Sequence, residues 1–530
     1  MRTWRRKPLA AAAGAALLVA GAACTADDEP DRPEESPRPL PTAFGGELPP
    51  GIGAEPLRHL HGPGGEGPGI LDDEMGVRIS SVGESFLISS NSEERHLLLG
   101  AADGETLWRG ERHIRRFGAD ADGSQVLVVD GADGGTEVIG DDGETVWRGS
   151  SPRETFLGGA VVRRPADWSP DDPYGDYTVL APGGEELWDY TFEAPDDDTP
   201  GADATAGPGA SPSAEPSDGA PADPDTTPDP DRGGVPVAAR DGVLLLDDGA
   251  GLLQARGIGP DSTGELLWSF AGDDPDLAGG TDVQRPRAEV VGTYDVPVEE
   301  AAEPGGADDD SPAAGSPSRT SSPSPGAGGV AEDGGGQETE ASTEASPGPG
   351  DGADTAEPTR PAVLVRWSVP EEPSVLSLHD LHTGELLWSF AEPGANPGGD
   401  EFAPPPLPGA LYEPATGTLL LPQATGEVSL IAVDLAAGEV RWAFEDEFEH
   451  TISPALAIQG YIYGDTRGAD DTTAQIVLDA EDKDVAAEGL GAYVEAATRQ
   501  GYSIVVSDRQ RFVFPPADGA GTDEETSPTG

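Results

Sequence analysis

Cysteine is almost absent from this chain of 530 residues, and Cys24 is its single thiol. One cysteine excludes an intramolecular disulfide bond and a zinc site built from several thiolates. The position of Cys24 near the N-terminus, rather than chemistry at an active site, is the better explanation for this residue.

Positive charge is also scarce. The chain has 31 Lys and Arg residues against 99 Asp and Glu, which gives a formal net charge of −68. Proteins that bind nucleic acid cluster Lys and Arg against the phosphates, so we expect no nucleic-acid partner. The densest basic cluster of the mature chain is Arg112, Arg115 and Arg116. We expect these arginines to form local ion pairs, with an acidic partner as the alternative.

Amphipathic helical patterns with caps are missing after Ala20. The apolar residues instead occur in short runs such as Val126–Val129, Val243–Leu246 and Ile504–Val506, bounded by Gly, Asp and Pro. Short apolar runs between turn-forming residues are typical of β-strands. The sequence therefore predicts an all-β fold.

The N-terminal residues 1–23 have the pattern of an export signal. A basic stretch that contains Arg5 and Arg6 precedes the apolar run Pro8–Ala20, which is shorter than the roughly 20 residues of a membrane span. The following Gly21–Cys24 resembles the lipobox of bacterial lipoproteins, which are cut before the cysteine and acylated on it. We expect Cys24 to be lipidated and to anchor an exported protein at the outer face of the cell membrane. An ordinary cleaved signal is the alternative, and the export route stays open between Sec and twin-arginine.

Four segments contain too few large apolar residues to form a core. Residues 24–66 are predicted to form a lipid-anchored disordered tether, and residues 515–530 a disordered tail. The acidic, Pro- and Gly-rich segments 194–232 and 299–360 read as disordered insertions, because their apolar surface cannot offset the entropy of ordering. The remaining residues between 67 and 514 form the predicted folded domain.

A short motif, Gly-Glu-x-x-Trp, occurs six times in this domain and sets its architecture. Once the insertions are removed, the copies recur at a basal spacing of about 40 residues, which is the length of a four-stranded propeller blade. The glycine and tryptophan of each copy are Gly104 and Trp108, Gly143 and Trp147, Gly184 and Trp188, Gly264 and Trp268, Gly384 and Trp388, and Gly438 and Trp442.

Each copy of the motif is predicted to form a hairpin. In the clearest copy, Val375–His379 alternates as a strand, the chain turns at Gly384, and Glu385–Phe390 returns as the outer strand. Trp388 then lies on the face that packs against the neighbouring blade.

A degenerate seventh copy runs from Asp479 to Asp484 and places Ala487 where tryptophan would stand. Beyond it the chain supplies about three more strands, and a strand between Gly51 and Leu71 would complete their sheet. Such closure removes exposed sheet edges. We expect eight four-stranded blades, with seven as the alternative.

The motif Asp-x-x-x-Gly-Glu-x-x-Trp-x-Phe resembles the repeat of pyrroloquinoline-quinone-like (PQQ-like) β-propellers, with Asp380 and Asp434 at the leading acidic position. This family includes quinoprotein dehydrogenases and a non-enzymatic outer-membrane assembly lipoprotein. The dehydrogenase activity implied by the resemblance would need a quinone and Ca²⁺ on the propeller axis. The usual Asn ligand has only Asn91 and Asn396 as candidates, and the disulfide of adjacent cysteines often seen in such enzymes cannot form.

We therefore expect no catalytic residue, no cofactor and no metal site. The preferred function is a membrane-anchored, extracytoplasmic scaffold that binds a protein partner across the propeller face. A module that binds a solute or a cell-wall polymer in the central funnel is the alternative, and a PQQ-dependent dehydrogenase is the third possibility.

Three groups of polar residues invite a metal-site interpretation. Asp120–Gly123 resembles a calcium loop, but the EF-hand spacing fails, so a hairpin turn is expected. His379 and His382 flank one hairpin and are interpreted as surface turn residues. His59 and His61 would share one face of a strand, which we interpret as a solvated edge.

Overall fold

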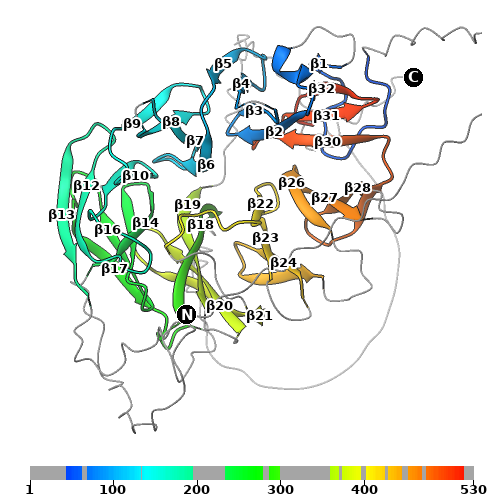
Figure 1. The fold of residues 1–530 in the computed structure, drawn as a ribbon. Helices are drawn as coiled ribbons and strands as arrows, with labels where there is room; N and C mark the ends of the chain where they lie inside the picture. The colour runs from blue at the N-terminus through cyan, green and yellow to red at the C-terminus, as the bar shows by residue number, and fades with distance from the viewer. Residues whose placement is uncertain are drawn as a thin grey trace, which may run out of the picture.

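A computed structural model describes residues 43–62, 68–92, 94–132, 134–194, 233–277, 286–298, 358–368, 373–395, 402–423, 428–444, 452–467 and 473–517. These residues form eight four-stranded antiparallel sheets arranged as the blades of a propeller (Figure 1). The predicted all-β fold with eight blades is confirmed. The predicted signal, the lipidation site Cys24, the greater part of both insertions and the end of the tail lie outside the described residues.

Blades I to IV follow one another along the chain, with the first strand of each nearest the centre of the ring (Figure 1). Blade I contains β2 (Val77–Val82), β3 (Ser85–Ser90), β4 (His96–Gly100) and β5 (Thr106–Gly110). Blade II contains β6 (Ile114–Ala119), β7 (Gln125–Asp130), β8 (Thr136–Gly140) and β9 (Thr145–Gly149). Blade III contains β10 (Glu154–Leu157), β11 (Ala160–Arg163), β12 (Gly175–Leu180) and β13 (Glu186–Phe192). Blade IV contains β14 (Val235–Arg240), β15 (Val243–Asp247), β16 (Leu252–Gly257) and β17 (Leu266–Ala271).

Blades V to VII continue in the same way, and blade VIII joins the two ends of the domain. Blade V contains β18 (Arg287–Pro297), β19 (Thr359–Ser368), β20 (Pro373–Asp380) and β21 (Leu386–Ala395). Blade VI contains β22 (Leu411–Glu413), β23 (Thr418–Pro422), β24 (Leu430–Asp434) and β25 (Glu439–Ala443). Blade VII contains β26 (Ser453–Ile458), β27 (Tyr461–Arg467), β28 (Thr473–Asp479) and β29 (Val485–Glu488). Blade VIII contains β30 (Ala492–Ala497), β31 (Ser503–Ser507), β32 (Gln510–Phe514) and β1 (Arg58–His61).

The ring is closed by the N-terminal strand, as the sequence predicted. β1 pairs antiparallel with β32, with Arg58 opposite Val513. The domain therefore begins earlier than the predicted tether boundary at residue 66, because Phe44, Leu48 and Ile52 also pack against blades VII and VIII. The second predicted insertion likewise ends earlier than residue 360, since β19 begins at Thr359.

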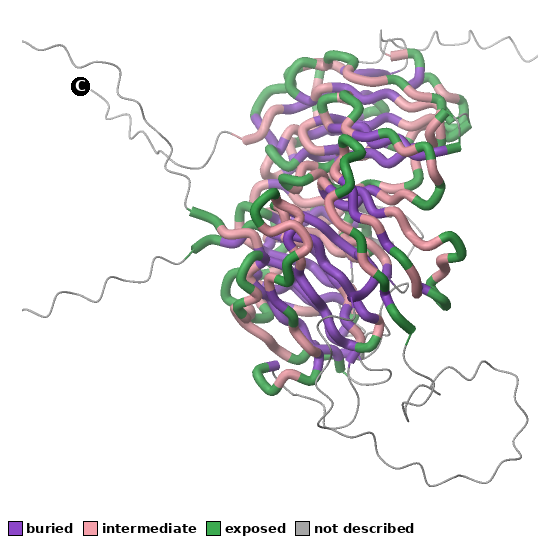
Figure 2. Tube along the Cα trace, turned by 90° about the vertical axis from the view of Figure 1, so that its left-hand side faces the viewer, coloured by how far each residue is buried: buried purple, intermediate pink, exposed green. Residues whose placement is uncertain are grey.

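The core lies between the blades rather than in one central layer. Buried strands run through the ring and exposed residues concentrate at the turns (Figure 2). Middle strands such as β15 are buried along their whole length, because both faces of a blade pack against neighbouring blades. The predicted strand Val375–His379 is confirmed within β20, and each of its five residues is buried for the same reason.

The motif tryptophans of blades IV, V and VI fasten each blade to the next. Trp388 donates its indole N–H to the main-chain oxygen of Leu435 at 2.9 Å. A Cβ atom on Gly438, in the same turn, would stand 2.3 Å from Cγ of Trp388. The motif glycine thus provides the space that the preceding blade's tryptophan occupies. Trp268 and Trp442 make the same bond, to the main-chain oxygens of Leu381 at 2.8 Å and Ala480 at 2.9 Å. We call this contact the indole latch.

A β-bulge precedes the tryptophan position in every one of the seven motif copies. In blade V, Leu378 pairs with Trp388 but the next residue, His379, pairs with Leu386, so Leu387 is the extra residue. A bulge redirects the following side chain and increases the local twist. The degenerate copy keeps this geometry, because Val477 pairs with Ala487 and Leu478 with Val485.

The missing tryptophan of the degenerate copy has a structural explanation. A tryptophan at Ala487 would need a hairpin turn between the third and fourth strands of blade VIII. That turn does not exist, because β32 and β1 come from opposite ends of the domain. In the degenerate turn itself, Lys483 holds the left-handed conformation of the motif glycine, with φ of 67° against 70° at Gly438.

No described helix is long and apolar enough to cross a membrane. The helical segment that the structure describes is the 3-10 turn η1 (Gly69–Asp72), which packs beside blade I.

Candidate functional site

Among the described residues, the indole latch is absent at three of the six interfaces that have a motif tryptophan, those between blades I and II, II and III, and III and IV. The turn that accepts the indole hydrogen bond, which we call the latched turn, spans six residues, as in 380–385 of blade V. The corresponding turns are five residues in blades II (140–144) and III (181–185) and nine in blade IV (257–265). Because the acceptor carbonyl sits in this turn, a change of turn length removes it. The motif tryptophans without a latch therefore lie in the first half of the ring, where two cavities open.

The larger cavity, of about 770 Å³, opens between blades I and II. It lies between η1, the start of β4, the end of β5 and the outer part of blade II. Its charged lining residues are Arg95, Arg109, Arg112, Arg148, Glu111 and Glu137. Its apolar walls include Ile70, Leu97 and Trp108. We call this site the arginine cavity.

Glu137 is the buried centre of the arginine cavity, with a side chain only 10% exposed. Its carboxylate accepts from Arg112 at 2.5 Å, from Arg148 at 2.9 Å and from the Thr145 hydroxyl at 3.0 Å. Burial opposes ionisation of Glu137, but the bonds from Arg148 and Thr145 and the charges of Arg148 and Arg112 outweigh it and lower the pKa. Glu137 is therefore an anion that orients two guanidinium groups.

The arginine cavity carries an excess of positive charge on a protein whose net charge is −68. Four arginines and two glutamates line it, and Glu137 is already shared between Arg112 and Arg148. Arg109 is exposed and pairs with no carboxylate in the part of the chain that the structure describes. Guanidinium groups bind carboxylate and phosphate through paired hydrogen bonds. The cavity can therefore hold an anionic group, and the wall that includes Trp108 can hold an apolar body attached to it.

The predicted basic cluster separates in the structure. Arg112 enters the arginine cavity, whereas Arg115 pairs with Asp130 on the same blade. Arg116 instead donates to the main-chain oxygen of Phe156 in blade III at 2.7 Å. Burial, and then the nearby charge of Arg164, lower the pKa of Arg116. Local ion pairing thus holds for the first two arginines and is wrong for the third.

The histidines differ from their predicted surroundings. His379 is fully buried, with Nε2 2.8 Å from the Ser377 hydroxyl, so the interpretation as a surface turn residue is wrong for it. His382 does lie exposed at the turn. His61 is buried beside Asp72 at 3.3 Å, because η1 covers the outer strand, and a solvated edge is therefore wrong for His61. His59 contacts Gln510 at 2.7 Å.

The acidic loop of blade II is a hairpin turn, as expected. Gly123 donates its main-chain N–H to the oxygen of Asp120 at 3.0 Å, between β6 and β7. Within the described residues, no group of three or more His, Cys, Asp or Glu side chains is arranged to hold a metal ion.

Of the residues that line the arginine cavity, sequence reasoning singled out Arg112 as part of a basic cluster and Trp108 as a repeat residue. Arg95, Glu137 and Arg148 come from three separate strands or loops, and nothing in their local sequence links them. The available signal was the density of arginine between Arg109 and Arg164 in a chain otherwise dominated by acidic residues.

No family model and no curated protein matches this sequence. Solved structures resemble it at low identity. BamB from Moraxella catarrhalis is 12% identical, with a TM-score of 0.36 over 83% of this chain and 96% of that one. The quinohemoprotein alcohol dehydrogenase from Comamonas testosteroni is 12% identical, with a TM-score of 0.37 over 83% and 74%. A europium-containing methanol dehydrogenase is 11% identical, with a TM-score of 0.35 over 81% and 82%. These likenesses do not choose between an enzyme and a binding protein.

Proposed function

We propose that this chain is a non-enzymatic scaffold that binds a protein partner, and that the arginine cavity receives an acidic segment of that partner. The observation that carries the proposal is the concentration of guanidinium groups in one cavity of a strongly acidic protein. An isolated positive site on a negative surface attracts an anionic group there and repels it elsewhere, which favours one docking position.

The chemistry of the arginine cavity supports binding without catalysis. Glu137 accepts hydrogen bonds from two guanidinium groups and a hydroxyl, and its pKa is lowered. A general base works best with a pKa near the operating pH, so a strongly ion-paired carboxylate is poorly suited to the task. The arginines supply hydrogen-bond donors in fixed positions, which is what recognition of a carboxylate requires.

We further propose that the propeller is exported and lipid-anchored through Cys24 at the outer face of the cell membrane. The support is the sequence of the N-terminal segment alone, with its basic start, short apolar run and lipobox-like Gly21–Cys24. Mass spectrometry of the N-terminal peptide is expected to show an acylated cysteine as the first residue. A Cys24→Ser variant is expected to lose the acyl chains, and an intact residue 1 in the mature wild-type protein would contradict the proposal.

Affinity capture tests the scaffold function. The full-length protein is purified with its partner from detergent-solubilised membranes, as wild type, Arg109→Glu and Arg78→Glu. Arg109 lines the arginine cavity, whereas Arg78, on β2 of the same blade, is also exposed but lies outside it. We expect Arg109→Glu to reduce partner recovery about tenfold or more, and Arg78→Glu to leave it unchanged. Equal recovery with all three proteins, or no recovered partner, would contradict the proposal.

A further inference from the structure

The interface between blades III and IV differs from the other two interfaces without a latch, because its turn is longer than a latched turn rather than shorter. The turn of blade IV spans nine residues, 257–265, where a latched turn such as 380–385 spans six. Gly264 still packs against the Trp188 ring, since a Cβ on it would stand 3.3 Å from Cγ of the indole. The longer turn nevertheless carries its carbonyl groups away, and the buried Nε1 of Trp188 has no hydrogen-bond partner among the described residues.

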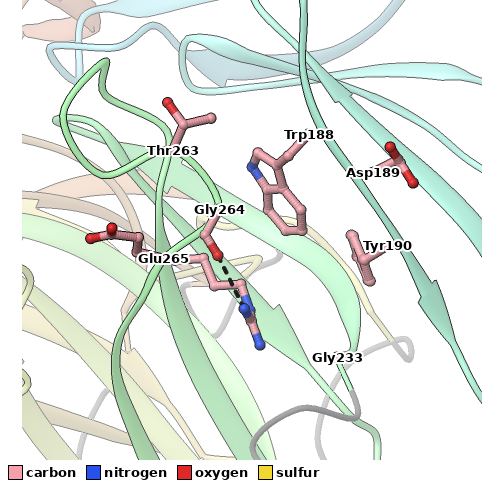
Figure 3. A pocket seen from close by; sticks show the side chains of 8 residues that line it. Trp188, Asp189, Tyr190, Gly233, Thr263, Gly264 and Glu265 are labelled. Carbon is pink, nitrogen blue, oxygen red and sulfur yellow. Dashed lines mark hydrogen bonds between the residues drawn. The ribbon is translucent and has the colours of Figure 1, made fainter.

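A cavity of about 360 Å³ occupies the space beside this unlatched indole. Its walls are the rings of Trp188 and Tyr190, whose centroids are 4.8 Å apart at a 31° angle, together with the main chain at Gly233 and Gly264. Asp189 and Glu265 also border the cavity, and Figure 3 shows their carboxylates turned away from the space between Trp188 and Arg256. Tyr190 already donates its hydroxyl to the main-chain oxygen of Gly234 at 2.6 Å, so it contributes its ring.

Arg256 is the polar wall of this cavity. It donates to the main-chain oxygen of Gly264 at 3.1 Å, drawn as a dashed line in Figure 3, and to Gln254 at 3.3 Å. Its guanidinium stands 6.0 Å from the Trp188 ring centroid. The guanidinium of Arg164, by comparison, is in contact with the Trp168 ring at 3.9 Å. The Trp188 face is thus only partly covered.

We propose that the cavity between blades III and IV is a binding site for the ring of a neutral sugar of the pyranose class. The apolar C–H face of a pyranose packs against aromatic rings, and the cavity presents two of them. Sugar hydroxyls accept hydrogen bonds, which matches the guanidinium of Arg256 and the indole N–H of Trp188 as donors. The cavity volume is at the lower end of the range for ligand sites, about 300–1,000 Å³, which suits one ring.

The charges at this site favour a neutral ligand over an ion. The cavity is lined by one guanidinium, from Arg256, and two carboxylates, from Asp189 and Glu265. The negative charges of Asp189 and Glu265 beside the cavity disfavour an anion, and the positive charge of Arg256 at its wall disfavours a cation. The arginine cavity has the opposite composition, so the two sites select different chemistry. The sugar site goes beyond the proposed scaffold function and does not depend on it.

Ligand-observed NMR tests the proposal with methyl β-glucopyranoside and methyl N-acetyl-β-glucosaminide as probes. We expect saturation transfer from the wild-type protein to the ring protons of at least one probe. Trp188→Leu is expected to abolish this transfer. Trp388→Leu removes the equivalent side chain from a latched interface and is expected to leave it intact, as is Arg109→Glu in the arginine cavity.

A second variant keeps the test decisive if Trp188→Leu unfolds. Deletion of residues 259–261 shortens the blade IV turn to six residues, which is expected to restore the indole latch, raise the melting temperature and abolish the transfer. The proposal is overturned if neither probe shows transfer from the folded wild-type protein. It is also overturned if transfer survives both Trp188→Leu and the deletion, or is lost equally in Trp388→Leu protein that is still folded. Because Arg109→Glu is measured in parallel, failure here is distinguishable from failure of the scaffold proposal.

Discussion

Arg58 donates a hydrogen bond of 2.6 Å to the main-chain oxygen of Ala101 and so joins blade VIII to blade I. Ala101 stands three residues before the motif glycine Gly104, as Leu435 stands before Gly438. A Cβ on Gly104 would lie 2.8 Å from Nε of Arg58, the space that a tryptophan ring occupies elsewhere. Arg58 thus takes the place of the indole latch at the point where the two ends of the chain meet.

Replacement of Arg58 by Leu is expected to destabilise the propeller by about 3 kcal/mol. The guanidinium also donates to Gly100 at 3.1 Å and to Ala102 at 3.0 Å, so the change leaves several carbonyl groups without their donor. The exposed Arg78 provides the control, and Arg78→Leu is expected to change the urea midpoint little. Similar midpoints for the two variants would show that the ring closes without this contact.

Trp388→Phe is expected to cost about 1–2 kcal/mol more than Trp188→Phe. Both variants keep an aromatic ring, but only the first leaves a main-chain acceptor, that of Leu435, without its donor. Within the part of the chain that the structure describes, the indole nitrogen of Trp188 has no hydrogen-bond partner to lose. The free energy of unfolding, measured by urea titration of both variants, gives the difference. A larger cost at Trp188 would contradict the assignment of the latch.

Alanine substitutions at two motif glycines separate two contributions to the free energy of unfolding, backbone strain and steric overlap with a tryptophan ring. Gly184 and Gly438 both have positive φ, 87° and 70°. A Cβ at Gly184 meets nothing within 4 Å, whereas one at Gly438 would meet the Trp388 ring at 2.3 Å. Gly184→Ala is therefore expected to cost about 1–2 kcal/mol from strain alone. Gly438→Ala is expected to cost about 1–3 kcal/mol more, because the ring must move. Equal thermal shifts would contradict this account.

His379 gives the stability a specific pH dependence. Burial, against weaker opposing effects of the Gly384 carbonyl and the Asp274 charge, lowers its pKa from the ordinary 6.5 to about 4. Between pH 6.5 and about pH 4, His379 is therefore protonated in the unfolded chain but not in the folded chain. This contribution to stability is fully present above pH 6.5 and is lost as the pH falls toward 4, by about 1.4 kcal/mol per unit.

The pH dependence is measured by urea denaturation between pH 7 and pH 5 for the wild type, His379→Gln and His382→Gln. Glutamine does not titrate, so His379→Gln is expected to show a shallower loss of stability than the wild type. The exposed His382 lies in the same hairpin, and its replacement is expected to keep the wild-type slope. Three parallel curves would show that burial does not hold His379 neutral.

The sequence predicted the ring because its signal is repeated. Six copies of one motif fix the spacing of the blades, and three leftover C-terminal strands require a fourth from the N-terminus. The dependence on repetition also explains why the arginine cavity could not be predicted. A repeat reveals what the blades share, whereas the arginine cavity depends on Arg95, Glu137 and Arg148, which differ from blade to blade. Their meeting is a product of blade packing that no local pattern encodes.

Burial was the other feature that the sequence concealed. Apolar and polar residues alternate in Val375–His379, which is typical of a strand with one solvent-exposed face. A propeller blade, however, has a neighbouring blade on each side. Ser377 and His379 are consequently inside, where Trp367 donates to the Ser377 hydroxyl at 2.7 Å. Polar residues in a strand pattern therefore do not reveal exposure when both faces are covered.

Site-specific photocrosslinking tests the scaffold account most directly. A benzophenone amino acid is placed at Arg109, in the arginine cavity, or at Glu185, in the exposed turn of blade III, and cells are irradiated before mass spectrometry. We predict a crosslink from position 109 to an Asp- and Glu-rich segment of one protein, weakened by high salt and absent from position 185. Equal crosslinking from both positions, or a crosslinked segment without acidic residues, would contradict the central claim that this propeller holds an acidic partner in its arginine cavity.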